Sequence, residues 1–265
     1  MTRAKVEITA RLFNSNFDFS RRSYNALSVG SDGNIYYVLS SSSIDHAAQV
    51  YRFDPTNDTI RHLGDLSEIV SEKGLRTVPQ GKSHVRFYEC EGKLYFASHV
   101  SHYTVIDGKE TMGSPPAGYL PYPGGHFISY DLSTGLFDDI VAFPDEGIIA
   151  MAMDALRGRL FGLTWPSGKF IVYDLVSAAR LTADVSSLGA DGCSSGCRSL
   201  AVDPRDGAAY FPVPSGHIVR FACQRRQLEL VSGDTLNKEY FGDYDASSGR
   251  DMAYHWRQAE WNPEE

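Results

Sequence analysis

The side chains best suited to chemistry gather in one stretch of the chain, between residues 82 and 126. Two polar groups stand there, the first formed by Lys82, Ser83 and His84, the second by Ser98, His99, Ser101, His102 and Tyr103. Four of the eight histidines, His84, His99, His102 and His126, belong to this stretch. Because imidazole exchanges protons near neutral pH and lysine neutralises anions, the stretch is a candidate for proton transfer or anion binding. Each histidine taken alone also fits a surface position or a hydrogen-bonded core position.

Further candidates for ligand binding lie in a long insertion and shortly after it. The insertion runs from Val105 to Gly125 and is followed by His126. Its prolines, glycines and aromatic residues, Tyr122 among them, suit the wall of a binding site. Trp165 suits stacking on a sugar ring, and it suits packing between structural units equally well.

Arginine and tyrosine candidates follow nearer the C-terminus. Arg198 fits either a paired hydrogen bond to a ligand carboxylate or a structural salt bridge. Tyr254 and Arg257 lie in the run from 250 to 258, which has the pattern of a strand. Tyr254 and His255 point to opposite faces of such a strand, so at most one of them faces a central site.

An internal repeat supplies the framework for these residues. A tight turn that enters an apolar strand occurs four times, as Asp32-Gly33-Asn34, Glu91-Gly92-Lys93, Arg157-Gly158-Arg159 and Asp206-Gly207-Ala208. Each glycine suits the positive φ angle of a two-residue hairpin turn. The repeat predicts four similar units of antiparallel strands.

Each unit has room for four strands. A short alternating strand precedes each turn, at 26–29, 85–88, 149–153 and 199–202, and a third strand follows, ending in a Tyr-Asp or Phe-Asp corner in three of the four copies. We therefore predict an all-β fold: a single β-propeller domain over residues 1–265, with four-stranded antiparallel blades at about 20–70, 80–143, 146–185 and 196–232. Hairpins stacked in a sandwich are the alternative architecture.

The C-terminal run from 247 to 265 is expected to start another blade. We predict a partial or small propeller of four to five blades, cut from a longer one or closed by association with another chain, because open edges otherwise remain unpaired. A closed five-bladed ring is the alternative. In either arrangement the candidate residues at the start of the first strand and the end of the second strand of each blade face one mouth of the central channel.

Composition limits the classes of partner. The 265 residues have a formal net charge of −8 and 42% hydrophobic content, which indicates a folded, soluble protein without general affinity for nucleic acid or anionic membranes. The N-terminus has no apolar stretch of a signal peptide, and the compartment stays open. The four cysteines, Cys90, Cys193, Cys197 and Cys223, fit ordinary thiols, with a local disulfide as the main exception.

Several runs resemble those of seven-bladed propeller polysaccharide lyases, the ulvan-lyase and oligogalacturonate-lyase group, and of their uncharacterised bacterial relatives. These runs are Gly81-Lys82-Ser83-His84, Leu94-Tyr95-Phe96-Ala97-Ser98-His99, Gly124-Gly125-His126-Phe127-Ile128-Ser129-Tyr130-Asp131 and Gly158-Arg159-Leu160-Phe161-Gly162-Leu163-Thr164-Trp165-Pro166. The resemblance covers most of residues 20–260. It implies β-elimination on an acidic oligosaccharide or polysaccharide that contains uronate, and a divalent ion such as Mn²⁺ is compatible with it.

The resemblance assigns roles to individual residues. It implies His84 as carboxylate neutraliser or base, assisted by His99 or His102. The family's tyrosine and arginine in the next blade have no counterpart here, because apolar residues stand near Ile148 and at Trp165. The catalytic candidates are then His84, His99, His102 and Tyr103. The substrate-binding candidates are Lys82, Tyr122, His126, Trp165, Arg198, Tyr254 and Arg257, and no fixed metal-ligand spacing is present.

Three functions fit these observations. The first is a polysaccharide lyase that acts on a uronate-containing glycan. The second is a propeller that binds a glycan or another ligand without catalysis, and the third is a scaffold that presents its top face to a protein. Convergence of His84, His99 and His126 around a cleft would favour the enzyme, and their dispersal over different faces would argue against it.

Overall fold

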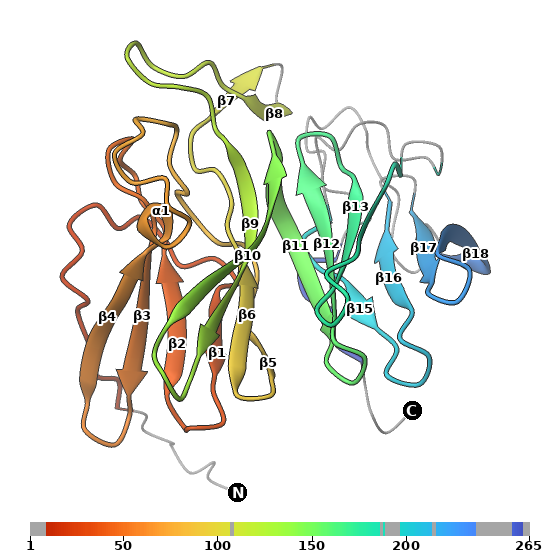
Figure 1. The fold of residues 1–265 in the computed structure, drawn as a ribbon, viewed down its shortest axis with the longest axis horizontal. Helices are drawn as coiled ribbons and strands as arrows, with labels where there is room; N and C mark the ends of the chain where they lie inside the picture. The colour runs from red at the N-terminus through yellow and green to blue at the C-terminus, as the bar shows by residue number, and fades with distance from the viewer. Residues whose placement is uncertain are drawn as a thin grey trace, which may run out of the picture.

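The chain folds into a series of antiparallel sheets. The computed structural model describes residues 9–106, 109–185, 188, 197–213, 216–236 and 256–261. Within these residues there are four four-stranded sheets and one two-stranded sheet, and the large sheets stand side by side along the molecule (Figure 1). The predicted propeller architecture of four-stranded antiparallel blades is confirmed. No helix in the described part of the chain is long and apolar enough to cross a membrane.

The first two blades occupy the N-terminal half. The first sheet consists of β1 (Leu27–Val29), β2 (Ile35–Leu39), β3 (Gln49–Asp54) and β4 (Thr59–Asp65), in that order. The second consists of β5 (Tyr88–Cys90), β6 (Lys93–Ala97), β9 (Gly124–Asp131) and β10 (Phe137–Pro144). The short helix α1 (Leu66–Ile69) lies between them and is capped by the Asp65 carboxylate, which accepts from the Glu68 amide.

The other two blades follow the same order. The third sheet consists of β11 (Gly147–Asp154), β12 (Arg159–Trp165), β13 (Phe170–Asp174) and β14 (Arg180–Ala183). The fourth consists of β15 (Ala201–Val202), β16 (Ala209–Pro212), β17 (His217–Ala222) and β18 (Gln227–Thr235). The two-stranded sheet, β7 (Tyr103–Ile106) with β8 (Lys109–Met112), occupies the first part of the insertion that we had expected to be a loop. The chain there pairs with itself as a hairpin.

Local chemistry explains why the strands turn where the sequence predicts. All four repeated glycines have positive φ, at 77° for Gly33, 74° for Gly92, 61° for Gly158 and 76° for Gly207. At the corners, Asp54, Asp131 and Asp174 each accept hydrogen bonds from backbone amides two and three residues further on. These bonds lower the pKa of Asp131 to about 2, with the Ser133 hydroxyl as the largest cause. The fourth corner has no aspartate, and there the Cys223 thiol donates a hydrogen bond to the Gly207 carbonyl.

Two sequence predictions of strands need correction. The first strand of the second blade is Tyr88–Cys90 and not 85–88, because both backbone groups of Phe87 bond to the Ser28 hydroxyl of the first blade. The expected strand at 250–258 lies outside the described residues up to position 255, and residues 256–258 are not in a strand. The segment 256–261 instead bonds to residues just before β15, through Arg198 and Ser199.

The apolar core lies between successive blades. One buried cluster joins the first two blades to the third and includes Tyr36, Phe96 and Phe127. The other joins the third and fourth blades around Phe161 and Phe170. Cys90 and Cys223 are free thiols, and Cys193 lies outside the described residues.

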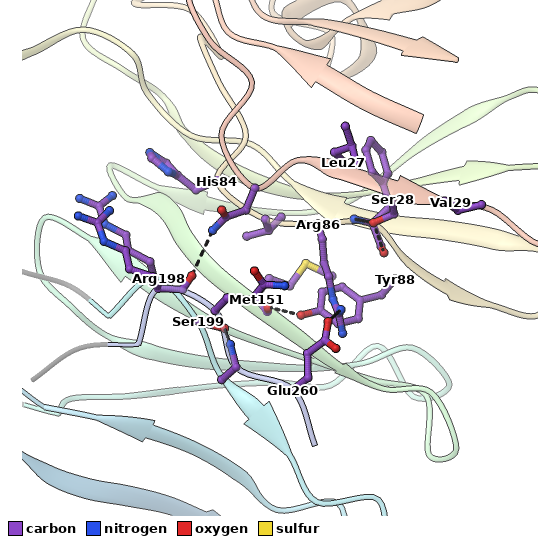
Figure 2. A pocket seen from close by; sticks show the side chains of 16 residues that line it. Leu27, Ser28, Val29, His84, Arg86, Tyr88, Met151, Arg198, Ser199 and Glu260 are labelled. Carbon is purple, nitrogen blue, oxygen red and sulfur yellow. Dashed lines mark hydrogen bonds and ion pairs between the residues drawn. The ribbon is translucent and has the colours of Figure 1, made fainter. Parts of the chain in front are cut away.

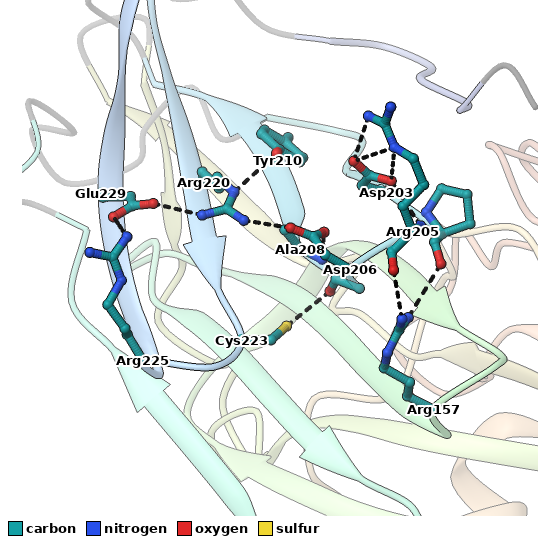
Figure 3. A network of polar contacts seen from close by, with 12 residues as sticks. Arg157, Asp203, Arg205, Asp206, Ala208, Tyr210, Arg220, Cys223, Arg225 and Glu229 are labelled. Carbon is teal, nitrogen blue, oxygen red and sulfur yellow. Dashed lines mark hydrogen bonds and ion pairs between the residues drawn. The ribbon is translucent and has the colours of Figure 1, made fainter. Parts of the chain in front are cut away.

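Polar contacts on the turn side reinforce the junction of the third and fourth blades. Arg157 donates to the carbonyls of Pro204 and Arg205, and on the fourth blade Arg220 lies between Asp206, Glu229 and Tyr210 (Figure 3). The Arg157 contacts join the third blade to the fourth, whereas the Arg220 contacts tie strands within the fourth blade.

The close packing of β9 against β10 leaves no room for a side chain at Gly124, and we predict that a substitution there lowers stability. This glycine has a φ of 132°, and a Cβ there would lie 2.2 Å from the carbonyl oxygen of Phe143. Gly33 also has positive φ but has open space around the position of a Cβ. We expect Gly124→Ala to lower the free energy of unfolding by about 3 kcal/mol or more, and Gly33→Ala by about 1 kcal/mol. Urea unfolding followed by circular dichroism measures both, and equal losses would contradict the steric argument.

Candidate functional site

The inner ends of the four blades surround one cavity of about 540 Å³. Its walls come from β1, the segment before β5, Met151 of β11, the residues before β15 and the segment 257–260. Ionisable side chains are prominent in this lining: His84, Arg86, Arg198 and Glu260 are labelled in Figure 2, and Arg257 also belongs to it. The cavity thus lies at the centre of the propeller arc, and its lining mixes ionisable with apolar side chains.

Backbone pairing fixes the residues beside His84, at the edge of the cavity. Lys82 and His99 form an isolated antiparallel bridge, with N···O distances of 3.0 Å and 2.8 Å. The bridge brings the segment before β5 alongside the end of β6, as predicted for the mouth of a blade. Gly147 at the start of β11 leaves room for the His99 ring, since a Cβ there would lie 2.1 Å from Nδ1.

The imidazoles of His84 and His99 lie together with aromatic neighbours. Their ring centroids are 4.9 Å apart in an edge-to-face arrangement. Tyr24 lies 4.5 Å from the His84 ring, and Trp165 lies 5.6 Å from the His99 ring. Nε2 of His84 and Nε1 of Trp165 are buried and have no hydrogen-bonding partner among the described residues. A ligand that reaches His84 can therefore form a hydrogen bond with Nε2 without displacing a described protein group.

Burial and positive charge keep both imidazoles neutral. Burial, followed by the charges of Lys82, Arg198 and Arg257, places the pKa of His84 well below 6.5. The pKa of His99 is lowered in the same way, first by burial and then by His84 and Lys82. Neutral imidazoles accept protons and hydrogen bonds at neutral pH.

Two cations accompany these rings, Lys82 buried and Arg198 largely so. Lys82 is 4% exposed, and its Nζ lies 4.6 Å from the centre of the Tyr103 ring and 5.3 Å from that of Tyr24. Burial lowers the pKa of Lys82 to about 8. Arg198 has one ion pair among the described residues, at 3.8 Å to Glu110, and its Nε is buried without a partner there. We call Lys82, His84, His99 and Arg198 the cation site.

His126 does not join the cation site. Its Nδ1 lies 2.8 Å from Asp139 and its Nε2 lies 3.2 Å from Glu72. Glu72 also accepts from Gln80, whose side-chain oxygen accepts from the Tyr122 hydroxyl at 2.7 Å. Burial alone would lower the pKa of His126, but the hydrogen bonds to Asp139 and Glu72 outweigh it and raise the pKa to about 9. His126 and Tyr122 thus belong to a buried polar network between blade and loop.

The remaining candidates take different positions. Tyr103 places its ring beside the Lys82 ammonium, and both Tyr103 and its neighbour His102 are partly buried. Trp165 is 2% exposed and packs under His99, so its faces are covered by protein. Arg257 lines the cavity, and its carbonyl accepts from Asn25 at 3.4 Å. Tyr254 lies outside the described residues.

Sequence reasoning missed two neighbours of the cation site, Tyr24 and Glu110. Tyr24 precedes the inner strand of the first blade, so the rule that selected Lys82 and His84 in the second blade also selects Tyr24 when it is applied to the first. Glu110 stands on the hairpin inside the insertion, and no signal in the sequence pairs it with Arg198. Gln80, Glu72 and Asp139 were likewise missed.

A divalent metal does not fit the residues seen here. Among the described side chains no group of three or more His, Cys, Asp or Glu residues is arranged to hold a metal ion. His84 and His99 offer two nitrogens beside two cations, which repel a metal. We therefore derive no step through a metal.

Comparison with known proteins gives the fold alone. No protein-family model and no curated protein matches the chain. Solved structures similar to it include a provisionally assigned 6-phosphogluconolactonase of Bacteroides uniformis (13% identity, TM-score 0.47, 78% of this chain and 55% of the other). They also include an auxiliary nutrient binding protein of Bacteroides thetaiotaomicron (12%, 0.44, 82% and 44%) and TolB of Acinetobacter baumannii (14%, 0.47, 83% and 45%). The chain spans about half the length of these three proteins. None of the three is described as a lyase, so that resemblance stays a prediction.

The His126 network predicts a pH dependence of stability. Because the pKa of His126 rises from 6.5 to about 9 on folding, its contribution is complete below pH 6.5 and is lost as pH rises through 9. We compare the free energy of unfolding of the wild type with that of His126→Gln. We expect the advantage of the wild type to be about 2–3 kcal/mol larger at about pH 6 than at about pH 9.5. Urea titrations at the two pH values measure this, with the exposed His46→Gln as control. A difference independent of pH would show that His126 is neutral in the fold.

Proposed function

We propose that this chain binds an acidic carbohydrate, one that carries a carboxylate, at the cation site, whose His84 and Arg198 line the central cavity. The observation that carries this proposal is the burial of Lys82 and the near-burial of Arg198, for which Glu110 is the single ion-paired partner of Arg198 among the described residues. Buried charges that lack full pairing cost several kcal/mol and are therefore typical of functional sites. The chain as a whole is acidic, with a net charge of −8, so this positive cluster is a local departure.

The surroundings of the cations support a sugar as the carrier of the acidic group. The cavity volume of about 540 Å³ suits a small oligosaccharide. Asn25 and Gln258 supply neutral side-chain amides in its wall. His84 adds a buried ring nitrogen that has no partner among the described residues. Such uncharged groups match hydroxyl groups, while Arg198 matches a carboxylate through its planar donors.

The proposal predicts how binding responds to loss of Arg198. We expect Arg198→Gln to weaken binding of a galacturonate trisaccharide about 10- to 100-fold, because a hydrogen bond to a charged group is lost in a desolvated place. Isothermal titration calorimetry measures the dissociation constant. Arg225→Gln, which removes an exposed arginine paired with Glu229, is the matched control and should bind as the wild type does. Equal binding of the neutral galactose trisaccharide would contradict recognition of the acid.

Cleavage of the same ligand by β-elimination is a second candidate function. The contact between His84 and His99 favours it, because a neutral imidazole can take the C5 proton of a uronate while Lys82 and Arg198 neutralise its carboxylate. The electron pair then forms the C4–C5 double bond and the glycosidic oxygen leaves with a proton, for which the candidate donors are Tyr24, whose ring contacts His84, and Tyr103, whose ring contacts Lys82. His126 belongs to a separate network, and for this reason binding ranks above catalysis.

The elimination leaves an unsaturated uronate that absorbs in the ultraviolet, which makes it testable. If the chain is a lyase, absorbance should rise on pectate, ulvan, heparan or alginate, with and without Mn²⁺, and His84→Ala should reduce the rate at least about 100-fold by removing the base. His46→Gln, at an exposed histidine, should leave the rate unchanged. No rise with any substrate, from folded protein that binds the trisaccharide, would restrict the function to binding.

A further inference from the structure

The hairpin β7–β8 places a carboxylate on the cation site. Val105 pairs with Glu110 and Tyr103 pairs with Met112, so these four side chains share one face of the hairpin. From this face Tyr103 covers Lys82, with 4.6 Å between Nζ and the ring centre. Glu110 reaches Arg198, with 3.8 Å between Oε2 and Nη2. One small element therefore contacts both cations.

The contact of Glu110 with Arg198 is weak for the partners involved. A distance of 3.8 Å exceeds that of a charge-assisted hydrogen bond. The Glu110 side chain is 36% exposed, whereas that of Arg198 is 15% exposed. The Nε of Arg198 is buried without a partner among the described residues, although a guanidinium can bind a carboxylate through two parallel hydrogen bonds. Glu110 neutralises the cations without completing their hydrogen bonding.

We propose that Glu110 is an internal competitor, which occupies the place of the ligand's acidic group and must leave when the ligand binds. This inference rests on the proposed binding function. Glu110 offsets part of the cost of burying positive charge here, because it is the one carboxylate that pairs with Arg198 in the described part of the chain, and its charge also acts on Lys82. The ligand's carboxylate takes its place and forms the paired hydrogen bonds that Glu110 does not form.

The competition makes the site selective. A neutral sugar cannot displace Glu110 from Arg198, since it offers no charge in return and leaves the cations less well compensated. A ligand carboxylate restores the charge balance, and the displaced Glu110 moves to water at a small cost because its side chain is already partly exposed. Glu110 thus lowers the affinity for all ligands and lowers it most for those without an acidic group.

The test is substitution of Glu110 by an isosteric neutral residue. We expect Glu110→Gln to bind the galacturonate trisaccharide about three- to tenfold more tightly than the wild type, because the ion pair and its repulsion of the ligand are both removed. Glu68→Gln removes the same charge from the exposed helix α1, where Glu68 pairs with Lys73, and should bind as the wild type does. Glu110→Ala should change binding in the same direction as Glu110→Gln. Calorimetry supplies the constants, and circular dichroism checks the fold of each variant.

The outcomes separate the two proposals. If the wild type binds the trisaccharide and Glu110→Gln binds it equally or less tightly, Glu110 is not a competitor, while the binding function stands. If the same gain appears for Glu68→Gln, the effect is one of net charge, and the competitor is again ruled out. If neither the wild type nor Glu110→Gln binds the acidic trisaccharide, both the binding function and the competitor are wrong.

Discussion

Two backbone hydrogen bonds between Lys82 and His99 determine the geometry of the cation site. They hold the segment before β5 against the end of β6. Further along the same segment, the backbone of Phe87 bonds to the Ser28 hydroxyl of the first blade. Lys82, His84 and His99 consequently face the junction of the inner strands. Ser98 continues the contact on either side, since its amide bonds to His126 and its carbonyl accepts from Ile148 of the third blade. The site is thus built at a seam between blades, so its geometry depends on how the blades pack.

This seam concentrates positive charge in a low-dielectric place. Lys82 comes from the second blade and Arg198 from the fourth, and each positive charge disfavours the protonation of neighbouring groups. Burial and Arg198 lower the pKa of Lys82, and burial and Lys82 lower the pKa of His84. A fold that only needed stability would place apolar side chains here, as it does between the blades at Phe161 and Phe170. The cost of these cations is therefore an argument for an anionic partner, and the partial compensation by Glu110 indicates where its charge would sit.

Local chemistry made the fold predictable, and tertiary contacts limited what could be predicted of the site. A glycine at positive φ, or an aspartate that accepts hydrogen bonds from the following amides, depends only on residues close by in the chain. The turns at Gly33 and Gly158 and the corner at Asp131 can therefore be predicted from the sequence. The displacement of β5 depends on Ser28, some sixty residues away in the chain. Glu110 and Glu72 lie in insertions without a repeat, so no comparison between blades places them.

The different surroundings of His99 and His126 in the second blade show why residue type alone does not define a site. His99 lies just beyond the end of β6, whereas His126 lies near the start of the neighbouring strand β9, and both are buried. His126 has a carboxylate at each ring nitrogen, so its imidazole is held charged and its hydrogen-bonding capacity is used within the protein. His99 faces His84 and the cations and stays neutral, and the adjoining His84 keeps a vacant nitrogen. Reactivity towards a ligand requires such unused capacity, and it is found where positive charge, not carboxylate, surrounds the ring.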